Sequence, residues 1–142
     1  MSSEPLFCQR FDIHGRDFAN AGKASITIKG ILREIGIHPS VIRRVAIASY
    51  EAEMNVVLYA DKGTMELRVT PKNVRITVED QGGGIPDVEL AMREGYSTAS
   101  DEIREMGFGA GMGLPNIKKN ADAFTVDSAL GKGTILNIMI NL

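Results

Sequence analysis

The chain has 142 residues, of which 44% are hydrophobic, so it is long and apolar enough to build one folded domain. Its 16 basic and 18 acidic residues leave a formal net charge of -2, which excludes the basic surface typical of nucleic-acid or anionic-membrane binding. The single cysteine, Cys8, excludes an internal disulfide, and no apolar run reaches the roughly 18 to 20 residues that span a bilayer. We expect one cytoplasmic domain over residues 1–142 that binds neither nucleic acid nor membrane.

The first part of the chain predicts a strand followed by two helices. Alternating apolar and polar residues predict a strand over residues 6–13. Apolar residues then recur at three- and four-residue steps, which predicts one helix over residues 17–36 with Asp17 as its N-cap. Ser40 opens a second helix, which ends near Ala60 and repeats apolar residues along one side.

The rest of the chain predicts four strands, a helix and a long loop. The regular elements are strands over residues 64–70, 74–79, 123–128 and 134–141, and a helix over 114–121. Residues 81–113 are rich in glycine and lack apolar periodicity apart from a short helix over 88–93, so we expect mostly mobile loop there. This order predicts an α+β fold, a two-layer sandwich in which helices cover one face of a mixed, mostly antiparallel sheet.

Two polar residues of the second helix are candidates for binding a ligand together. Glu51 and Asn55 stand four residues apart, so their side chains leave one face of the helix about one turn from each other. An amide oxygen beside a carboxylate suits Mg2+, and the carboxylate can also polarise a hydroxyl or a water molecule. A solvated helix face explains the same pair, and on the pair alone it is the commoner explanation. Glu53 points elsewhere on the helix and is expected to be exposed.

A carboxylate followed by glycines ends one of the predicted strands. Asp80 can accept a hydrogen bond from an exocyclic amine such as N6 of adenine, while Gly82 and Gly84 leave room for a flat ring. Thr134, which begins the last strand, can bond the base beside Asp80. The alternatives are a glycine-rich turn capped by Asp80 and a plain hairpin turn before Thr134.

A second glycine-rich segment leads into the helix predicted over residues 114–121. Its free backbone N–H groups and the positive end of the helix dipole suit a polyphosphate. The spacing fits neither G-x-G-x-x-G nor G-x-x-x-x-G-K-[ST], so we expect neither a Rossmann site nor a P-loop. A flexible linker is the alternative. The candidate phosphate-binding residues are Gly107, Gly109, Gly111, Met112, Gly113 and Leu114.

Taken in order, these motifs resemble the N, G1, G2 and G3 boxes of the GHKL, or Bergerat-fold, ATPase and kinase superfamily. The matching motifs are Glu51-x-x-x-Asn55, Asp80-x-Gly82-x-Gly84, Gly111-Met112-Gly113-Leu114 and Gly131-x-Gly133-Thr134. The resemblance implies that ATP or ADP binds with Mg2+, that Asn55 is a ligand of the metal ion, and that Glu51 is the general base. It also implies that Asp80 and Thr134 contact adenine, and that residues 87–110 form a lid over the nucleotide.

Within this superfamily the motifs fit the stand-alone kinases best. Sensor histidine kinases place a phosphoacceptor histidine ahead of this domain, whereas His14 and His38 lie near turns here. Residues 85–99 resemble the lid of switch kinases, although Glu53 and Met54 depart from the usual N box. The resemblance implies a serine/threonine kinase of the anti-sigma or stressosome-switch kind, which phosphorylates a small STAS-domain partner and can form a homodimer. The alternatives are a nucleotide-gated protein that sequesters a sigma factor or another regulator without kinase activity, and a nucleotide sensor with the same site.

Overall fold

The computed structural model of the protein describes residues 7–81, 113–129 and 133–142. Its elements are β1 (Phe7–His14), a 3₁₀ helix (Phe18–Asn20), α1 (Lys23–Glu34), α2 (Pro39–Tyr59), β2 (Lys62–Val69), β3 (Asn73–Asp80), α5 (Gly113–Asn120), β4 (Ala123–Ala129) and β5 (Gly133–Asn141). The five predicted strands are confirmed, and so are the two helices predicted from Ser40 and Leu114. The predicted loop and its short helix over 88–93 lie outside the described residues, apart from Gln81 and Gly113.

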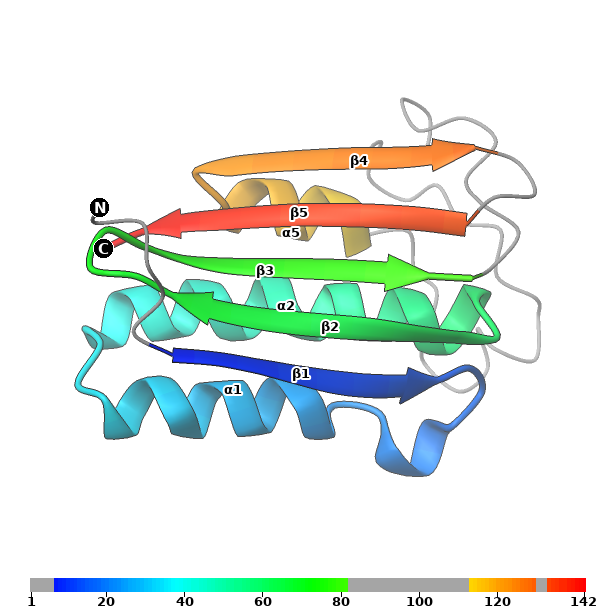
Figure 1. Ribbon diagram of the computed structural model, residues 1–142, viewed down its shortest axis with the longest axis horizontal. Helices are drawn as coiled ribbons and strands as arrows, with labels where there is room; N and C mark the ends of the chain where they lie inside the picture. The colour runs from blue at the N-terminus through cyan, green and yellow to red at the C-terminus, as the bar shows by residue number, and fades with distance from the viewer. Residues whose placement is uncertain (1–6, 82–112, 130–132) are drawn as a thin grey trace.

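The described strands form one sheet in the order β1-β2-β3-β5-β4. All the described helices lie on one face of this sheet (Figure 1), which confirms the predicted two-layer α+β fold. The prediction of a mixed sheet is not met in the described strands, because each of their four pairings is antiparallel. Residues 70–72 join β2 to β3 and residues 130–132 join β4 to β5, and both connections are too short for the crossover that a parallel pair needs.

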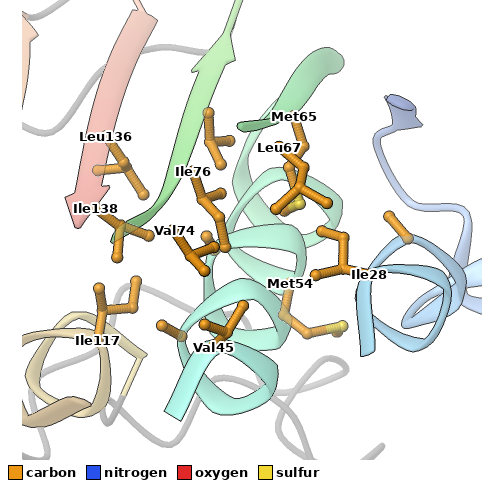
Figure 2. Packing of buried hydrophobic residues seen from close by; sticks show 14 of the residues in the cluster. Ile28, Val45, Met54, Met65, Leu67, Val74, Ile76, Ile117, Leu136 and Ile138 are labelled. Atoms are coloured by element: carbon orange, nitrogen blue, oxygen red, sulfur yellow. The ribbon is translucent and has the colours of Figure 1, made fainter. Parts of the chain in front are cut away.

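The hydrophobic core lies between the sheet and the helices. Residues along β2, β3 and β5 alternate, so one face of each strand is apolar and buried beneath the helices. Figure 2 shows side chains from these strands meeting Ile28 of α1, Met54 of α2 and Ile117 of α5. Each fully buried aliphatic side chain of this kind contributes about 1.5–3 kcal/mol of burial free energy. The core thereby fixes all three helices against the sheet.

The first helix starts later than the sequence predicts. Instead of one helix from Asp17, the 3₁₀ helix ends at Asn20 and α1 begins at Lys23. Gly22 between them has a left-handed backbone with φ of 95°, a conformation that cannot continue a right-handed helix. The apolar spacing runs across this break because Phe18 packs against the same core as α1 does. Periodicity alone therefore predicted one helix where there are two.

The prediction that Glu53 is exposed is wrong, because its side chain is only 3% exposed. Oε2 of Glu53 accepts hydrogen bonds from the backbone N–H groups of Gly22 at 3.0 Å and Ala24 at 3.2 Å. Oε1 accepts one from the N–H of Ser25 at 3.0 Å. The N-cap residue of α1 offers no side-chain cap, so this carboxylate on α2 satisfies N–H groups that the first turn leaves free. It also lies at the positive end of the α1 dipole.

Candidate nucleotide-binding site

Predicted site residues from distant parts of the chain meet at one end of the sheet. Asp80, the last residue of β3, is paired across the sheet with Thr134 of β5. Both side chains are on the helix-covered face, and they are 8% and 4% exposed. In Figure 1 α2 ends at this same end of the sheet, and the first turn of α5 is nearer to that end than its last turn. The predicted contacts to the base and to the phosphates therefore share one end of the molecule.

The hydroxyl of Thr134 is oriented by Ser128 of β4. Their Oγ atoms are 2.8 Å apart, and Oγ of Ser128 donates a hydrogen bond to the carbonyl of Gly133 at 3.1 Å. Ser128 has a single hydroxyl proton, so when that proton is on the carbonyl of Gly133, Thr134 donates the bond between the two hydroxyls. The oxygen of Thr134 is left as an acceptor beside the acceptor oxygens of Asp80. Such a pair of acceptors fits an exocyclic amine, which has two N–H groups.

Gly133 allows the backbones of β3 and β5 to meet closely at this point. Its φ is 83°, and a Cβ on this residue would collide with the carbonyl oxygen of Asp80. A side chain at position 133 would therefore be destabilising for two reasons: the backbone is left-handed, and the neighbouring strand leaves no room for a Cβ. The close approach holds Thr134 in register with Asp80.

Replacing Gly133 with alanine should lower the free energy of unfolding by about 3 kcal/mol, since backbone strain and overpacking each cost about 1–3 kcal/mol. The measurement is urea unfolding, monitored by circular dichroism. Gly30→Ala is the matched control, because Gly30 lies in α1 with no atom within 4 Å of an added Cβ. That control should raise the free energy of unfolding by about 0.5–1 kcal/mol. Equal effects of the two changes would contradict this account of Gly133.

Glu51 of α2 lies against the start of α5. A Cβ on Gly113, the first residue of α5, would lie 3.5 Å from Oε2 of Glu51. Asn116, in the first turn of α5, donates a side-chain hydrogen bond to the same carboxylate. Burial raises the pKa of Glu51 above its ordinary value, and the bond from Asn116 offsets part of that rise. A half-buried carboxylate with a raised pKa, held at a helix N-terminus, is typical of a group that exchanges protons with a ligand.

Asn55 lies one turn after Glu51 on α2 and is half-buried. Its neighbour Val56 packs over Gly63, where β2 passes the end of β3. A Cβ on Gly63 would lie 3.0 Å from Cγ1 of Val56 and 3.2 Å from Cβ of Asp80. The absence of a side chain at Gly63 therefore lets this part of α2 approach the strand end that carries Asp80.

The remaining predicted residues are either undescribed or buried. Those outside the described residues are Gly82, Gly84, Gly107, Gly109, Gly111 and Met112, as is the predicted lid over 87–110. Leu114 is described, and its side chain lies in the hydrophobic core. A nucleotide at the start of α5 would therefore meet only the backbone of Leu114.

Three features of the site escaped the sequence analysis. Asn116 bonds Glu51, Ser128 orients Thr134, and Gly63 makes room between α2 and Asp80. Asn116 stands three residues after Gly113, the last glycine of the segment, so the sequence already placed it in the first turn of the predicted helix. Ser128 and Gly63 depend on cross-strand register, which no local pattern specifies.

Two features are absent from the residues that the structure describes. No three His, Cys, Asp or Glu side chains within residues 7–81, 113–129 and 133–142 are grouped so that they could hold a metal ion. In the same part of the chain, no helix combines the length and the apolar character needed to cross a membrane.

The fold and the site define a nucleotide-binding domain of a known class. The sequence model of the family described as histidine kinase-, DNA gyrase B-, and HSP90-like ATPase matches residues 40–142, and the chain belongs to this family. It is 34% identical to the serine/threonine-protein kinase RsbT of Bacillus subtilis over 110 residues, which are 75% of this chain and 77% of that protein. It is 33% identical to the anti-sigma F factor of Caldanaerobacter subterraneus over 102 residues, 68% of each chain. The predicted superfamily, and its branch of switch kinases and anti-sigma factors, are thereby confirmed.

Solved structures show the same fold. A chain of the SiaB-SiaC complex from Pseudomonas aeruginosa superposes with a TM-score of 0.61 and 12% identity, over 96% of this chain and 90% of that one. The mycobacterial sensor histidine kinase MprB gives a TM-score of 0.53 and 19% identity, over 94% of this chain and 97% of that one. At these identities the likeness concerns the fold.

Proposed function

We propose that the protein is an ATP-dependent serine/threonine protein kinase that acts in a bacterial regulatory switch. The observation that carries the proposal is the carboxylate of Glu51, which lies against the first residue of α5 in a chain of this ATPase family. The similarity to a relative named as a serine/threonine-protein kinase supports the same activity. In this proposal residues 1–142 act as one domain.

Adenine would bind between Asp80 and Thr134. Both side chains present acceptors on the helix-covered face of the sheet, as the hydrogen bond with Ser128 indicates for Thr134. The N6 amine of adenine supplies two donors to such a pair, whereas guanine carries a carbonyl oxygen at the corresponding position. Gly82 and Gly84 are proposed to border the ring. This arrangement favours ATP and ADP over GTP.

The phosphates would bind at the start of α5. The first turn of a helix has N–H groups without intrahelical partners, and the helix dipole favours an anion there. Gly113 lies in this turn, and the glycines at 107, 109 and 111 are proposed to extend the same cradle. Asn55 would supply a protein ligand to Mg2+, an ion that takes few protein ligands and several phosphate or water oxygens. When bound, Mg2+ neutralises charge on the phosphates.

In the proposed reaction the hydroxyl oxygen of a serine or threonine on the partner attacks the γ-phosphorus in line with the bond to ADP. A new P–O bond forms to that oxygen, and the bond between the γ-phosphorus and the bridging oxygen breaks. The bridging oxygen leaves on ADP with the electron pair of the broken bond. The hydroxyl proton passes to the carboxylate of Glu51, which the raised pKa makes a better acceptor. Residues 87–110 are proposed to close over the nucleotide and exclude water.

The proposed partner is a small STAS-domain protein. The support is the similarity to relatives named as a serine/threonine-protein kinase and as anti-sigma F factors. We propose that the protein acts in the cytoplasm and forms a homodimer, as in the anti-sigma branch. A second function, nucleotide-gated sequestration of a sigma factor, is favoured by the anti-sigma F relatives and uses the same site.

A phosphotransfer assay distinguishes the kinase from the sequestering protein. The purified chain is incubated with Mg2+ and γ-labelled ATP, together with each STAS-domain protein and each sigma factor encoded in the same genome. Label on a serine or threonine of a STAS-domain protein supports the kinase. A nucleotide-dependent complex with a sigma factor, without label on any protein, would instead support sequestration.

Asp80→Asn should weaken Mg-ATP binding roughly 100-fold, because a buried donor would then face the N6 amine in place of an acceptor. Titration calorimetry with Mg-ATP, Mg-ADP and Mg-GTP measures the loss, and circular dichroism checks that the fold is kept. Asp127→Asn is the control, since Asp127 is exposed on β4. An unchanged affinity of Asp80→Asn for Mg-ATP would show that adenine does not bind beside Asp80.

A further inference from the structure

The strand β1 forms one edge of the sheet. Among the described strands it pairs only with β2, and in Figure 1 no described strand lies beyond it. An edge strand exposes a row of backbone N–H and C=O groups, which is a template for pairing with another strand. The outer side of β1 is therefore a candidate interaction surface.

The register of β1 on β2 shows which backbone groups point to this outer side. The N–H of Gly15, just after β1, donates to the carbonyl of Asp61 at 2.8 Å, and these two residues continue the β1–β2 register. In an antiparallel pair only every second residue bonds the neighbouring strand. The odd-numbered residues of β1 therefore bond β2, and the even-numbered residues direct their N–H and C=O groups outward. The outward residues are Cys8, Arg10, Asp12 and His14.

The charges on these outward residues suit a second copy of the same strand. The side chain of Arg10 is 68% exposed and pairs with Glu66 of β2 at 3.4 Å, and Asp12 is exposed as well. If two copies of β1 pair antiparallel about a two-fold axis at Phe11, Arg10 of each copy is opposite Asp12 of the other. A shift of the axis by one residue would instead place Arg10 opposite its own copy, or Asp12 opposite its own copy. Only the register about Phe11 brings opposite charges together.

Phe11 itself fits this register. It packs against the hydrophobic core from the helix-covered face of β1, yet it is only half-buried. At the axis it would face its copy at a non-hydrogen-bonded position, where the side chains of two strands come closest. Aromatic pairs across antiparallel strands are stabilising. A two-fold axis perpendicular to the sheet also keeps the helices of both copies on one face.

We propose that the outer edge of β1 is a homodimer interface, at which two copies of the chain join into one antiparallel sheet about Phe11. This inference rests on the homodimer included in the proposed function, and it does not require phosphotransfer. Asp80 lies on β3, and β2 separates β3 from the interface. The candidate nucleotide site of each copy therefore stays accessible in the dimer.

Charge reversal at the edge tests the register, and sedimentation of the full chain over a range of concentrations gives the dissociation constant of the dimer. Arg10→Asp should raise this constant about tenfold, and so should Asp12→Arg, because like charges would then face each other twice in each dimer. The double variant restores opposite charges and should return to within about threefold of the wild type. Arg68→Asp is the matched control, since Arg68 also bonds Glu66 but lies on β2, away from the edge.

A disulfide between copies tests the same register independently. In the proposed dimer, position 14 of each copy is opposite Cys8 of the other, with Cα atoms about 5.5 Å apart, which is within reach of a disulfide. Within one chain the two positions are about 20 Å apart along an extended strand, so a bond between them forms only between copies. His14→Cys should therefore give a linked dimer with copper phenanthroline as oxidant, and mass spectrometry identifies the linked peptides. Lys62→Cys is the control, because Lys62 is opposite His14 on the inner strand β2.

Weaker dimers in both single reversals, recovery in the double variant and the link in His14→Cys support the proposal. A wild-type dimer that is indifferent to Arg10→Asp, or that is linked through Cys8 of both copies, would overturn this interface and leave the homodimer standing. A wild type that stays monomeric at every concentration would overturn both the interface and the homodimer. The phosphotransfer assay then still decides the kinase function.

Discussion

Glu53→Ala is expected to lower the free energy of unfolding by about 3 kcal/mol. Three buried N–H groups would lose their acceptor, at a cost of about 1–3 kcal/mol each. Removal of the buried charge of Glu53 would offset part of this cost. The three groups are the backbone N–H groups of Gly22, Ala24 and Ser25, which all bond the carboxylate of Glu53. These donors lie at the N-terminus of α1, and the N-cap residue, Gly22, has no side chain that could replace the lost acceptor. The change should therefore loosen α1 from α2.

Urea unfolding measures the loss of unfolding free energy, and hydrogen exchange shows which backbone amides are affected. The amides in the first turn of α1 should exchange faster than those of β3. Glu34→Ala is the control, since Glu34 is exposed at the end of α1 and its replacement should change stability by less than about 0.5 kcal/mol. A loss in Glu53→Ala no larger than that of the control would show that water or another group satisfies the N–H groups.

Local patterns were sufficient to predict the strands and the helices α2 and α5. Burial alternates along all of β2, and along β3 and β5 from their second residue, because one face of the sheet packs under helices while the other is solvated. The same alternation placed Asp80 and Thr134 at strand ends, and the order of the motifs predicted that they belong to one site. Their pairing in adjacent strands agrees with that prediction, although their role in binding remains a prediction.

The errors arose where distant segments decide the outcome. Glu53 looked like an exposed residue because its partners are in α1, about 30 positions away in the chain. The start of α1 was misplaced because the apolar repeat runs across Gly22, and periodicity does not signal that this glycine takes a positive φ. Both errors concern one contact, since Gly22 donates to Glu53. Glu53, the carboxylate that departs from the usual N box, therefore caps the N-terminus of α1.

The polar residues of α2 divide between two tasks. Glu51 and Asn55 are four residues apart, whereas Glu53 lies halfway between them in sequence and so leaves the helix on another side. Glu53 bonds α1, and Glu51 bonds α5. A shift of α1 or α5 relative to α2 would therefore change the contacts of these carboxylates. We expect the position of α2 between its two neighbours to set the geometry of the proposed base.

Glu51→Gln should reduce phosphotransfer roughly 10²- to 10⁴-fold, the usual contribution of a general base. Glutamine keeps the shape of the side chain and an oxygen that accepts the bond from Asn116, but it cannot take up the proton of the attacking hydroxyl. The affinity for Mg-ATP should be kept. The measurement is the initial rate of labelling of the STAS-domain substrate, with Glu79→Gln, an exposed carboxylate on β3, as the control.

The same substitution has a predicted effect on stability, opposite in sign to its effect on activity. Burial raises the pKa of Glu51 in the folded chain above its unfolded value, so the stabilising contribution of this group is present at low pH and is lost as pH rises through the folded pKa. At pH 7 the ionised carboxylate is therefore unfavourable, and Glu51→Gln should unfold at a higher temperature than the wild type. Thermal unfolding at several pH values should show this advantage shrinking as pH falls through the folded pKa of Glu51 and absent below the ordinary pKa of glutamate. If Glu51→Gln is inactive but no more stable than the wild type at pH 7, Glu51 is less buried than in the structure. If Glu51→Gln is more stable and fully active, another group accepts the proton of the attacking hydroxyl.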